Sequence, residues 1–193
     1  MSETLKVNSK RWWDSIVGRW AANGDKRDRP HEFKKVAADI DAGSVLEIGC
    51  AVGSFCKYLK PAIQYFGTDI SSAMVEIARK EYPRKIFLEL DIFNMNLGKW
   101  QNAFTHTCAF QVLEHFEMEQ FLKFINVCSK VSQVSLYFSV PKGLPTTADR
   151  KADGHYIGWN TLNDFAKDVK GFGIINELPC DDTHLMGELV WHN

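Results

Sequence analysis

The architecture of this 193-residue chain can be worked out from the stretch VLEIGCAVG at residues 45–53. Apolar residues over 44–48 predict a short buried strand, which ends at a turn with small residues at positions 49, 51 and 53. Small residues allow a tight turn and let a ligand come close to the backbone. A strand followed by such a turn is typical of an open α/β sheet with a ligand site at its carboxyl edge.

Strands and helices alternate along the chain around this turn. Apolar and β-branched runs predict further strands over residues 62–68, 86–90, 105–112, 134–140, 174–178 and 185–191. Apolar residues at helical spacing predict helices over 54–60, after strand four, after a cap formed by Ser71-Ser72, and after the N-cap Asn160. One or two more helices are expected before residue 44, with a break near Gly24 and Pro30. The pattern predicts a doubly wound, Rossmann-like α/β fold with a seven-stranded, mostly parallel sheet and an antiparallel C-terminal hairpin.

The composition indicates an ordinary globular protein of one domain. Apolar residues make up 45% of the chain and charged residues 24%, and 193 residues are enough for one sizeable core. The chain holds 23 Lys and Arg against 24 Asp and Glu, so its formal net charge is −1. This balance excludes a strongly basic nucleic-acid-binding chain and a polybasic membrane anchor.

The sequence also predicts a cytoplasmic location. No apolar run approaches the roughly 20 residues that a membrane span needs, and the N-terminal residues lack a signal-peptide core. The five cysteines are scattered and form no C-x-x-C pair. We therefore expect reduced thiols rather than a disulfide framework, and no metal site.

Acidic residues near the ends of the first three strands indicate the kind of ligand. Glu47 precedes the glycines, Asp69 follows it by 69 − 47 = 22 residues, and Asp91 follows the third strand. An acidic residue at the distance of Asp69 can accept both hydroxyls of a ribose. A parallel sheet would bring all three carboxylates to one edge, where they outline a nucleoside-shaped crevice.

Two other nucleotide ligands fit the turn poorly. The nicotinamide fingerprint G-x-G-x-x-G would need glycine where Ala51 and Ser54 stand, which disfavours a nicotinamide-dependent oxidoreductase. A phosphate-binding loop is also absent, because no Gly-Lys-Ser/Thr follows the glycines. The turn therefore suits an adenosine ligand without a pyrophosphate.

Four successive segments carry a resemblance to a known family. VLEIGCAVGSF, YFGTDISSAMVEIAR, LELDIF and AFQVLEHF are similar to the four motifs of class I S-adenosylmethionine-dependent methyltransferases, across residues 44–140. GHYIGWNTLNDFAKDVKGFGI more weakly resembles the stretch after strand five in the small-molecule branch of that family. The resemblance implies S-adenosylmethionine as cofactor and S-adenosylhomocysteine as product. It also implies a helical lid over 1–43, a cofactor-binding core over 44–140, and an acceptor loop with the last strands over 141–193.

The resemblance assigns cofactor-binding roles to residues at the ends of four strands. The turn around the methionine half would comprise Glu47, Gly49, Cys50, Ala51 and Gly53. Further contacts would come from Asp69 on the ribose hydroxyls, Ile70 and Ile92 beside the adenine, Asp91 on the adenine amino group, and Gln111 by the methionine portion. Ala51 departs from the commoner central glycine, which its small side chain makes tolerable.

The implied reaction is in-line displacement of the sulfonium methyl group by the acceptor atom, in which the protein mainly positions the reactants. An acceptor hydroxyl or ammonium must also lose a proton, and histidine is the natural base near neutrality. His115, just past strand four, and His155, in the loop after strand five, are the candidates, although each could instead have a structural role. Glu114 is expected to be a structural partner of backbone amides near the helix start.

The acceptor is expected to be a small molecule, methylated on oxygen or nitrogen. Strand four ends in Phe110-Gln111-Val112 rather than the Asn/Asp-Pro-Pro-aromatic sequence of enzymes that methylate amino groups of nucleic acids, so no nucleic-acid partner is expected. The acceptor site would come from the N-terminal lead, the segment after strand four and the loop 142–158. Aromatic side chains could form its walls, at Trp12, Trp13, Trp20, Tyr156 and Trp159. The alternative is a non-catalytic sensor or regulatory module that binds the same cofactor, and the oligomeric state stays open.

Overall fold

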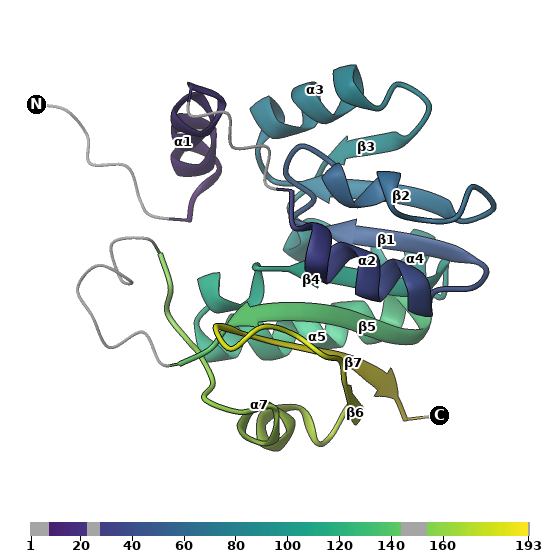
Figure 1. Cartoon of the computed structure of the whole chain (residues 1–193), viewed down its shortest axis with the longest axis vertical. Coiled ribbons are helices and arrows are strands. Elements are labelled where there is room, and N and C mark those ends of the chain that lie inside the picture. Colours follow the sequence, from purple (N-terminus) through teal and green to yellow (C-terminus); the bar gives the residue numbers. More distant parts are fainter. Residues whose placement is uncertain (1–7, 23–27, 144–153, 193) are drawn as a thin grey trace, which may run out of the picture.

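One seven-stranded sheet forms the centre of the computed structural model, which describes residues 8–22, 28–143 and 154–192, without the side chains of 18–22. The strand order is β3-β2-β1-β4-β5-β7-β6 (Figure 1). The strands are β1 Ser44–Ile48, β2 Gln64–Asp69, β3 Ile86–Glu89, β4 Phe104–Phe110, β5 Ser132–Pro141, β6 Gly173–Glu177 and β7 His184–Trp191. All pairings are parallel except those of β7, which runs antiparallel to both β5 and β6. The predicted doubly wound fold with an antiparallel hairpin is confirmed.

The strand order reverses between β1 and β4. The chain steps from β1 through β2 to β3 at one edge, then returns to place β4 on the other side of β1. In open α/β sheets, the connections on the two sides of such a reversal diverge and leave a crevice outside the carboxyl ends of the strands. The fold therefore places a ligand site beyond Ile48 and Phe110, where β1 and β4 end.

Helices cover both faces of the sheet. The α-helices are α1 Lys10–Ala22, α2 Pro30–Asp39, α3 Ser72–Glu81, α4 Leu97–Trp100, α5 Met118–Val131 and α7 Leu162–Val169. Short 3-10 turns are η1 Ser54–Lys57, η2 Ile92–Asn94 and η3 Leu113–His115. The second N-terminal helix begins at Pro30, as the predicted break at this residue requires, whereas Gly24 lies outside the described residues.

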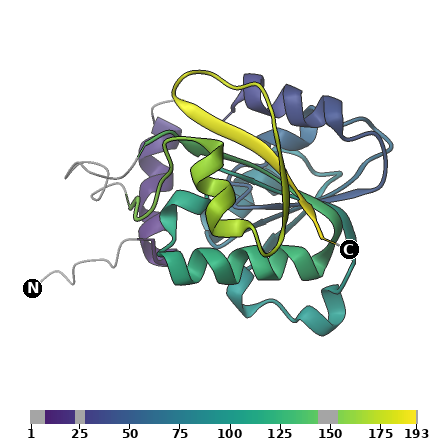
Figure 2. The ribbon, with the colours of Figure 1, turned by 90° about the horizontal axis from the view of Figure 1, so that it is seen from below.

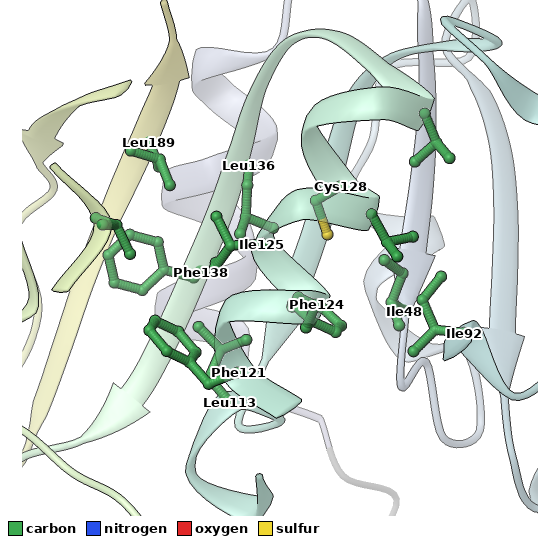
Figure 3. Packing of buried hydrophobic residues seen from close by; sticks show 14 of the residues in the cluster. Ile48, Ile92, Leu113, Phe121, Phe124, Ile125, Cys128, Leu136, Phe138 and Leu189 are labelled. Atoms are coloured by element: carbon green, nitrogen blue, oxygen red, sulfur yellow. The ribbon is translucent and has the colours of Figure 1, made fainter. Parts of the chain in front are cut away.

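Side-chain alternation along β1 divides the core into two layers. Leu46 and Ile48 point into one cluster, where they meet residues of α5 such as Phe124 (Figure 3). Val45 points to the opposite face, where it joins Val36 of α2 and residues of α3. Figure 2 shows α7 beside α5, over the same face of the sheet. Because both faces of β1 are buried, the strand carries apolar side chains on both of them.

Two local predictions need correction. The expected helix over 54–60 is only the 3-10 turn η1, because Pro61 follows within one turn and disfavours helical geometry at Lys60. The N-cap of α7 is Thr161 rather than Asn160, since the Thr161 side chain accepts a hydrogen bond from the backbone N–H of Asp164 at 3.1 Å. The Ser71 cap of α3 is confirmed, with the Met74 N–H donating to its hydroxyl. Among the helices that the structure describes, none is long and apolar enough to cross a membrane.

Gly53 provides a test of the turn after β1. Its backbone is left-handed, with φ of 77°, and an added Cβ would lie 2.5 Å from the Phe87 ring. Gly53→Ala should therefore lower the free energy of unfolding by about 2–4 kcal/mol, through backbone strain and overlap. Gly171→Ala is the matched control, because a Cβ added there would meet nothing within 4 Å. Urea unfolding should show it within about 0.5 kcal/mol of wild type, and equal effects of the two changes would contradict the packing role.

Candidate active site

A pocket of about 750 Å³ opens at the carboxyl edge of the sheet, where the strand order reverses. Nearly all of the predicted site residues line it, namely Glu47, Gly49, Cys50, Ala51, Asp69, Ile70, Asp91, Ile92, Gln111, His115 and His155. Gly53 does not line it. Gly53 instead packs against Phe87 and Ala78, and a side chain at this position would overlap them.

The turn after β1 is tight and left-handed at three positions. Gly49 has φ of 72° and Gly53 of 77°, while Ala51, between them, has φ of 46°. Residues with a Cβ rarely adopt this conformation, so Ala51 is held there by its surroundings. A side chain at Gly49 would lie 2.5 Å from Val112, so the turn also touches the segment after β4.

Asp69 holds this turn to the start of α3. One carboxylate oxygen, Oδ2, accepts the Ala51 N–H at 2.8 Å, and the other, Oδ1, accepts the Ser71 N–H at 2.8 Å. Burial raises the Asp69 pKa to about 6, against the lowering effect of these hydrogen bonds. The carboxylate keeps further lone pairs for a ligand on its pocket side.

Glu47 lies deeper in the wall and is internally satisfied. It is 3% exposed, and the Tyr65 hydroxyl donates a hydrogen bond to Oε2. Burial raises the pKa of Glu47 to about 8; the Tyr65 hydrogen bond opposes this, and the nearby charge of Asp69 adds to it. Near neutral pH this side chain is therefore mostly protonated.

Asp91 and Gln111 complete the rim at the ends of β3 and β4. Asp91 Oδ1 accepts the Phe93 N–H at 3.0 Å and so caps η2, which presents Ile92 beside it. Gln111 has a left-handed backbone with φ of 56°, and its Nε2 donates to the Ser139 hydroxyl at 3.2 Å. Strained residues of this kind persist where the surroundings over-determine them, commonly at ligand sites.

Glu114, His115 and His155 form a cluster at the other end of the pocket. Their ligand-type atoms all lie within 4.8 Å of one another. His115 Nδ1 lies 3.1 Å from the Gly154 carbonyl oxygen, and its ring meets that of His155 edge-on at 4.9 Å. The Glu114 side chain is 3% exposed, and its Oε2 has no hydrogen-bond partner. Burial raises the pKa of Glu114 to about 8.

The helix α1 covers the pocket between these two ends. Its Asp14 accepts a hydrogen bond from the Ser71 hydroxyl at 2.6 Å, and Lys10 donates to the Ser72 hydroxyl at 2.8 Å. On the opposite side, Trp13 packs edge-on against His115 at 4.9 Å. Figure 1 shows α1 beside α3 at this end of the sheet. The helix is thus docked on both sides of the crevice.

Only some of the aromatic residues predicted to form the pocket walls line the pocket. Trp12 and Trp13 line the pocket, whereas Trp159 is buried in the core, where its Nε1–H donates to Asp168 at 2.7 Å. Tyr156 is 43% exposed and lies outside the pocket. The side chain of Trp20 and residues 144–153 of the expected acceptor loop lie outside the described part of the chain.

Several lining residues escaped the sequence analysis. Arg29 is the most informative, since it is the only Lys or Arg among the described residues of the pocket wall. It is one of eight basic residues over 10–35, a stretch that from the sequence could bind an anionic acceptor or the cofactor carboxylate, although a solvated helix face is favoured. Nothing in the sequence distinguishes Arg29 from the other seven. Other additions are Asn8, Ile16, Phe33, Ile48, Met74, Leu90, Phe93, Phe110, Val112, Phe116 and Gln120. Glu114, which the sequence assigned a structural role at the helix start, lines the pocket as well.

Comparison with known proteins agrees with this geometry. Residues 46–131 match the family described as Methyltransferase domain, and this span contains the glycine turn, Asp69, Asp91 and Glu114. The match covers 131 − 46 + 1 = 86 of the 193 residues and agrees with the resemblance of the sequence motifs to class I S-adenosylmethionine-dependent methyltransferases. No protein of curated function matches the chain by sequence.

Solved structures share the fold at low sequence identity. The N-methyltransferase NodS from Bradyrhizobium japonicum WM9, solved with S-adenosylhomocysteine, is 19% identical with a TM-score of 0.71, covering 93% of this chain and 97% of NodS. Magnesium protoporphyrin IX methyltransferase from Synechocystis PCC 6803 is 16% identical with a TM-score of 0.61, covering 98% and 87%. A TehB-like methyltransferase from Corynebacterium glutamicum is 15% identical with a TM-score of 0.66, covering 95% and 98%.

The buried Glu47 makes the stability of this protein depend on pH. Folded Glu47 keeps its proton up to about pH 8, whereas the unfolded side chain loses it near its ordinary value of 4.5. Between these values the folded state binds more protons, so the free energy of unfolding falls as pH rises. Thermal unfolding of the cofactor-free protein should show lower stability at pH 8.5 than at pH 5.5, with a smaller difference in Glu47→Gln. The exposed Glu76→Gln should keep the full difference, and an unchanged pH dependence in Glu47→Gln would refute the assignment.

Proposed function

We propose that this methyltransferase transfers the methyl group of S-adenosylmethionine to the oxygen or nitrogen of a small molecule. The observation that carries the proposal is a single pocket that joins two sets of residues. Asp69 and Asp91, the residues proposed to bind the cofactor, line one part of it, and Glu114, His115 and His155 lie together beyond the segment that touches the glycine turn. A pocket of about 750 Å³ lies within the usual range for small-molecule sites, roughly 300–1,000 Å³.

The cofactor is proposed to lie across the carboxyl ends of the strands. Asp69 would accept hydrogen bonds from the ribose hydroxyls, and Asp91 from the adenine amino group, with Ile70 and Ile92 against the ring. The glycine turn would face the methionine half, close to Gln111. Arg29, with a side chain 26% exposed, supplies a guanidinium for the methionine carboxylate or for an anionic group of the acceptor.

The acceptor is proposed to bind under α1, in the part of the pocket that Trp12 and Trp13 line. This helix narrows the crevice, so the arrangement favours a small molecule over a polymer. The five cysteines are free thiols and four of them are buried, which supports a reducing, cytoplasmic setting.

The reaction would proceed by in-line displacement. The acceptor lone pair attacks the methyl carbon, the carbon–sulfur bond breaks, and its electron pair stays on sulfur as the neutral thioether. Positioning lowers the barrier, because the two reactants are held in one enclosed space. His115 and His155 are the proposed catalytic residues, placed to orient the acceptor and to assist the departure of its proton.

Asp69→Ala tests the cofactor site. Loss of the charge-assisted hydrogen bonds to the ribose should weaken S-adenosylhomocysteine binding about 10- to 100-fold, as measured by calorimetry. Asp41→Ala is the control, since Asp41 is an exposed carboxylate paired with Lys60 far from the pocket. Wild-type protein that fails to bind at millimolar concentration, or an Asp69→Ala protein that is folded and binds normally, would remove the proposed cofactor placement.

His115→Ala and His155→Ala test the acceptor end. Each should lower turnover at saturating cofactor by roughly 100-fold, measured as S-adenosylhomocysteine release with a library of hydroxyl and amine acceptors. Binding of S-adenosylhomocysteine should change little, because neither residue is placed at the adenosine. The exposed His31→Ala on α2 should retain full turnover. Full activity of both pocket variants across pH would show that neither histidine assists the reaction.

A further inference from the structure

We propose that Glu114, His115 and His155 bind one divalent transition-metal ion that faces the acceptor side of the pocket. The three residues supply a carboxylate oxygen and two imidazole nitrogens, and these atoms lie within 4.8 Å of one another. Two histidines and one carboxylate form a known ligand set for Zn²⁺ and for other first-row divalent ions, and they leave positions open for water or substrate. This site replaces the expectation from the sequence that the chain has no metal site.

The state of Glu114 is an independent observation in favour of a ligand. Its side chain is buried, with 3% exposed, and its Oε2 has no hydrogen-bond partner. A buried carboxylate oxygen without a partner is costly, and native proteins rarely leave one unless it serves a ligand or an ion. Glu47, the other deeply buried glutamate of the pocket, differs because Tyr65 donates to it. A cation beside Glu114 would supply the missing partner.

The backbone around the cluster is arranged to hold the imidazoles in place. His115 Nδ1 is within hydrogen-bond distance of the Gly154 carbonyl, at 3.1 Å, while Nε2 faces Glu114 Oε1 at 3.9 Å. A hydrogen bond from Nδ1–H to that carbonyl leaves the Nε2 lone pair directed toward Glu114, as in metal-bound histidines with a carbonyl partner. The residue after His155, Tyr156, donates its backbone N–H to the Glu114 carbonyl oxygen at 2.8 Å.

The spacing requires only side-chain adjustment. Ligand atoms around a four-coordinate ion at about 2.1 Å are about 3.4 Å apart. The 3.9 Å between His115 Nε2 and Glu114 Oε1 is close to this value, and the widest separation in the cluster, within 4.8 Å, would close by rotation about side-chain bonds. His155 is partly exposed, so it has room to turn.

The ion also distinguishes between oxygen and nitrogen acceptors, a step that rests on the proposed function. A neutral amine nitrogen has one lone pair, so an amine bound to the ion could not attack the methyl carbon. A bound hydroxyl loses its proton more readily and keeps further lone pairs on oxygen. In that case the oxygen attacks, the carbon–sulfur electron pair passes to sulfur, and the proton leaves to solvent. The inference therefore favours O-methylation of a hydroxyl-bearing small molecule.

Metal binding by untagged protein, stripped with a chelator, tests the site without any acceptor. Titration with Co²⁺, followed by its visible absorption, and calorimetry with Zn²⁺ should show one ion per chain. Glu114→Gln, His115→Gln and His155→Gln should each weaken binding at least about tenfold. His184→Ala is the matched control, because His184 is paired with a carboxylate, Asp181, on the surface. This variant should bind as wild type does.

Three results would overturn the inference. These are no saturable binding by the wild-type protein, binding that survives all three Gln variants, and a thiolate-to-cobalt charge-transfer band, which would place the ion on cysteine. Thermal unfolding confirms that each variant is folded, and His155→Gln lies in a partly exposed loop where folding is least at risk. S-adenosylhomocysteine binding, measured on the same samples, separates the two proposals: a protein that binds the cofactor but no metal ion refutes only the metal site.

Discussion

The hydrogen bonds of the Asp69 carboxylate hold the cofactor side of this molecule together. One oxygen takes the Ala51 N–H from the turn after β1, and the other takes the Ser71 N–H at the start of α3. Two segments that leave adjacent parallel strands are thereby joined at the carboxyl edge of the sheet. The Ser71 side chain in turn caps α3 and donates to Asp14 of α1. The Asp69 carboxylate thus connects the turn after β1 to α3 and, through Ser71, to α1.

Three carboxylates of the pocket, those of Asp69, Glu47 and Glu114, differ in how their loss of hydration is compensated. Asp69 is offset by two backbone amides and Glu47 by a tyrosine hydroxyl. Each of these two arrangements is complete within the protein, so neither requires a cation. Glu114 keeps an oxygen without a hydrogen-bond partner, next to two imidazoles. The contrast matters because loss of hydration acts on all three side chains, and among them only Glu114 has a buried oxygen without a hydrogen-bond partner.

The sequence predicted the sheet, and it predicted most of the residues that line the pocket at its carboxyl edge, for a physical reason. The strand–turn unit, Asp69 and Asp91 are local features, and their positions follow once parallel strands share a carboxyl edge. The ends of elements were less predictable. The apolar spacing predicts a helix over 54–60, but Pro61 limits it to the single turn η1, and the spacing alone does not show where a helix before a proline must end. Trp159 shows a second limit. It lies four residues after His155 of the pocket, but its own ring packs on Phe121 and Phe165 in the core.

The part of the pocket around His115 and His155 was less predictable, because segments that are far apart in the sequence form it. Asn8 donates to the carbonyl oxygens of both His115 and Gly154, at 3.0 and 2.7 Å, and so ties the start of α1 to two loops that are far apart in sequence. Gly154 has to be glycine here, because a Cβ would lie 2.4 Å from Asn8 Oδ1 and its φ is 79°. The same Gly154 carbonyl meets the His115 ring. Movement of α1 that broke the Asn8 bonds would therefore also remove support from the Gly154 carbonyl that meets the His115 ring, so the cover of the pocket and the placement of His115 depend on the same contacts.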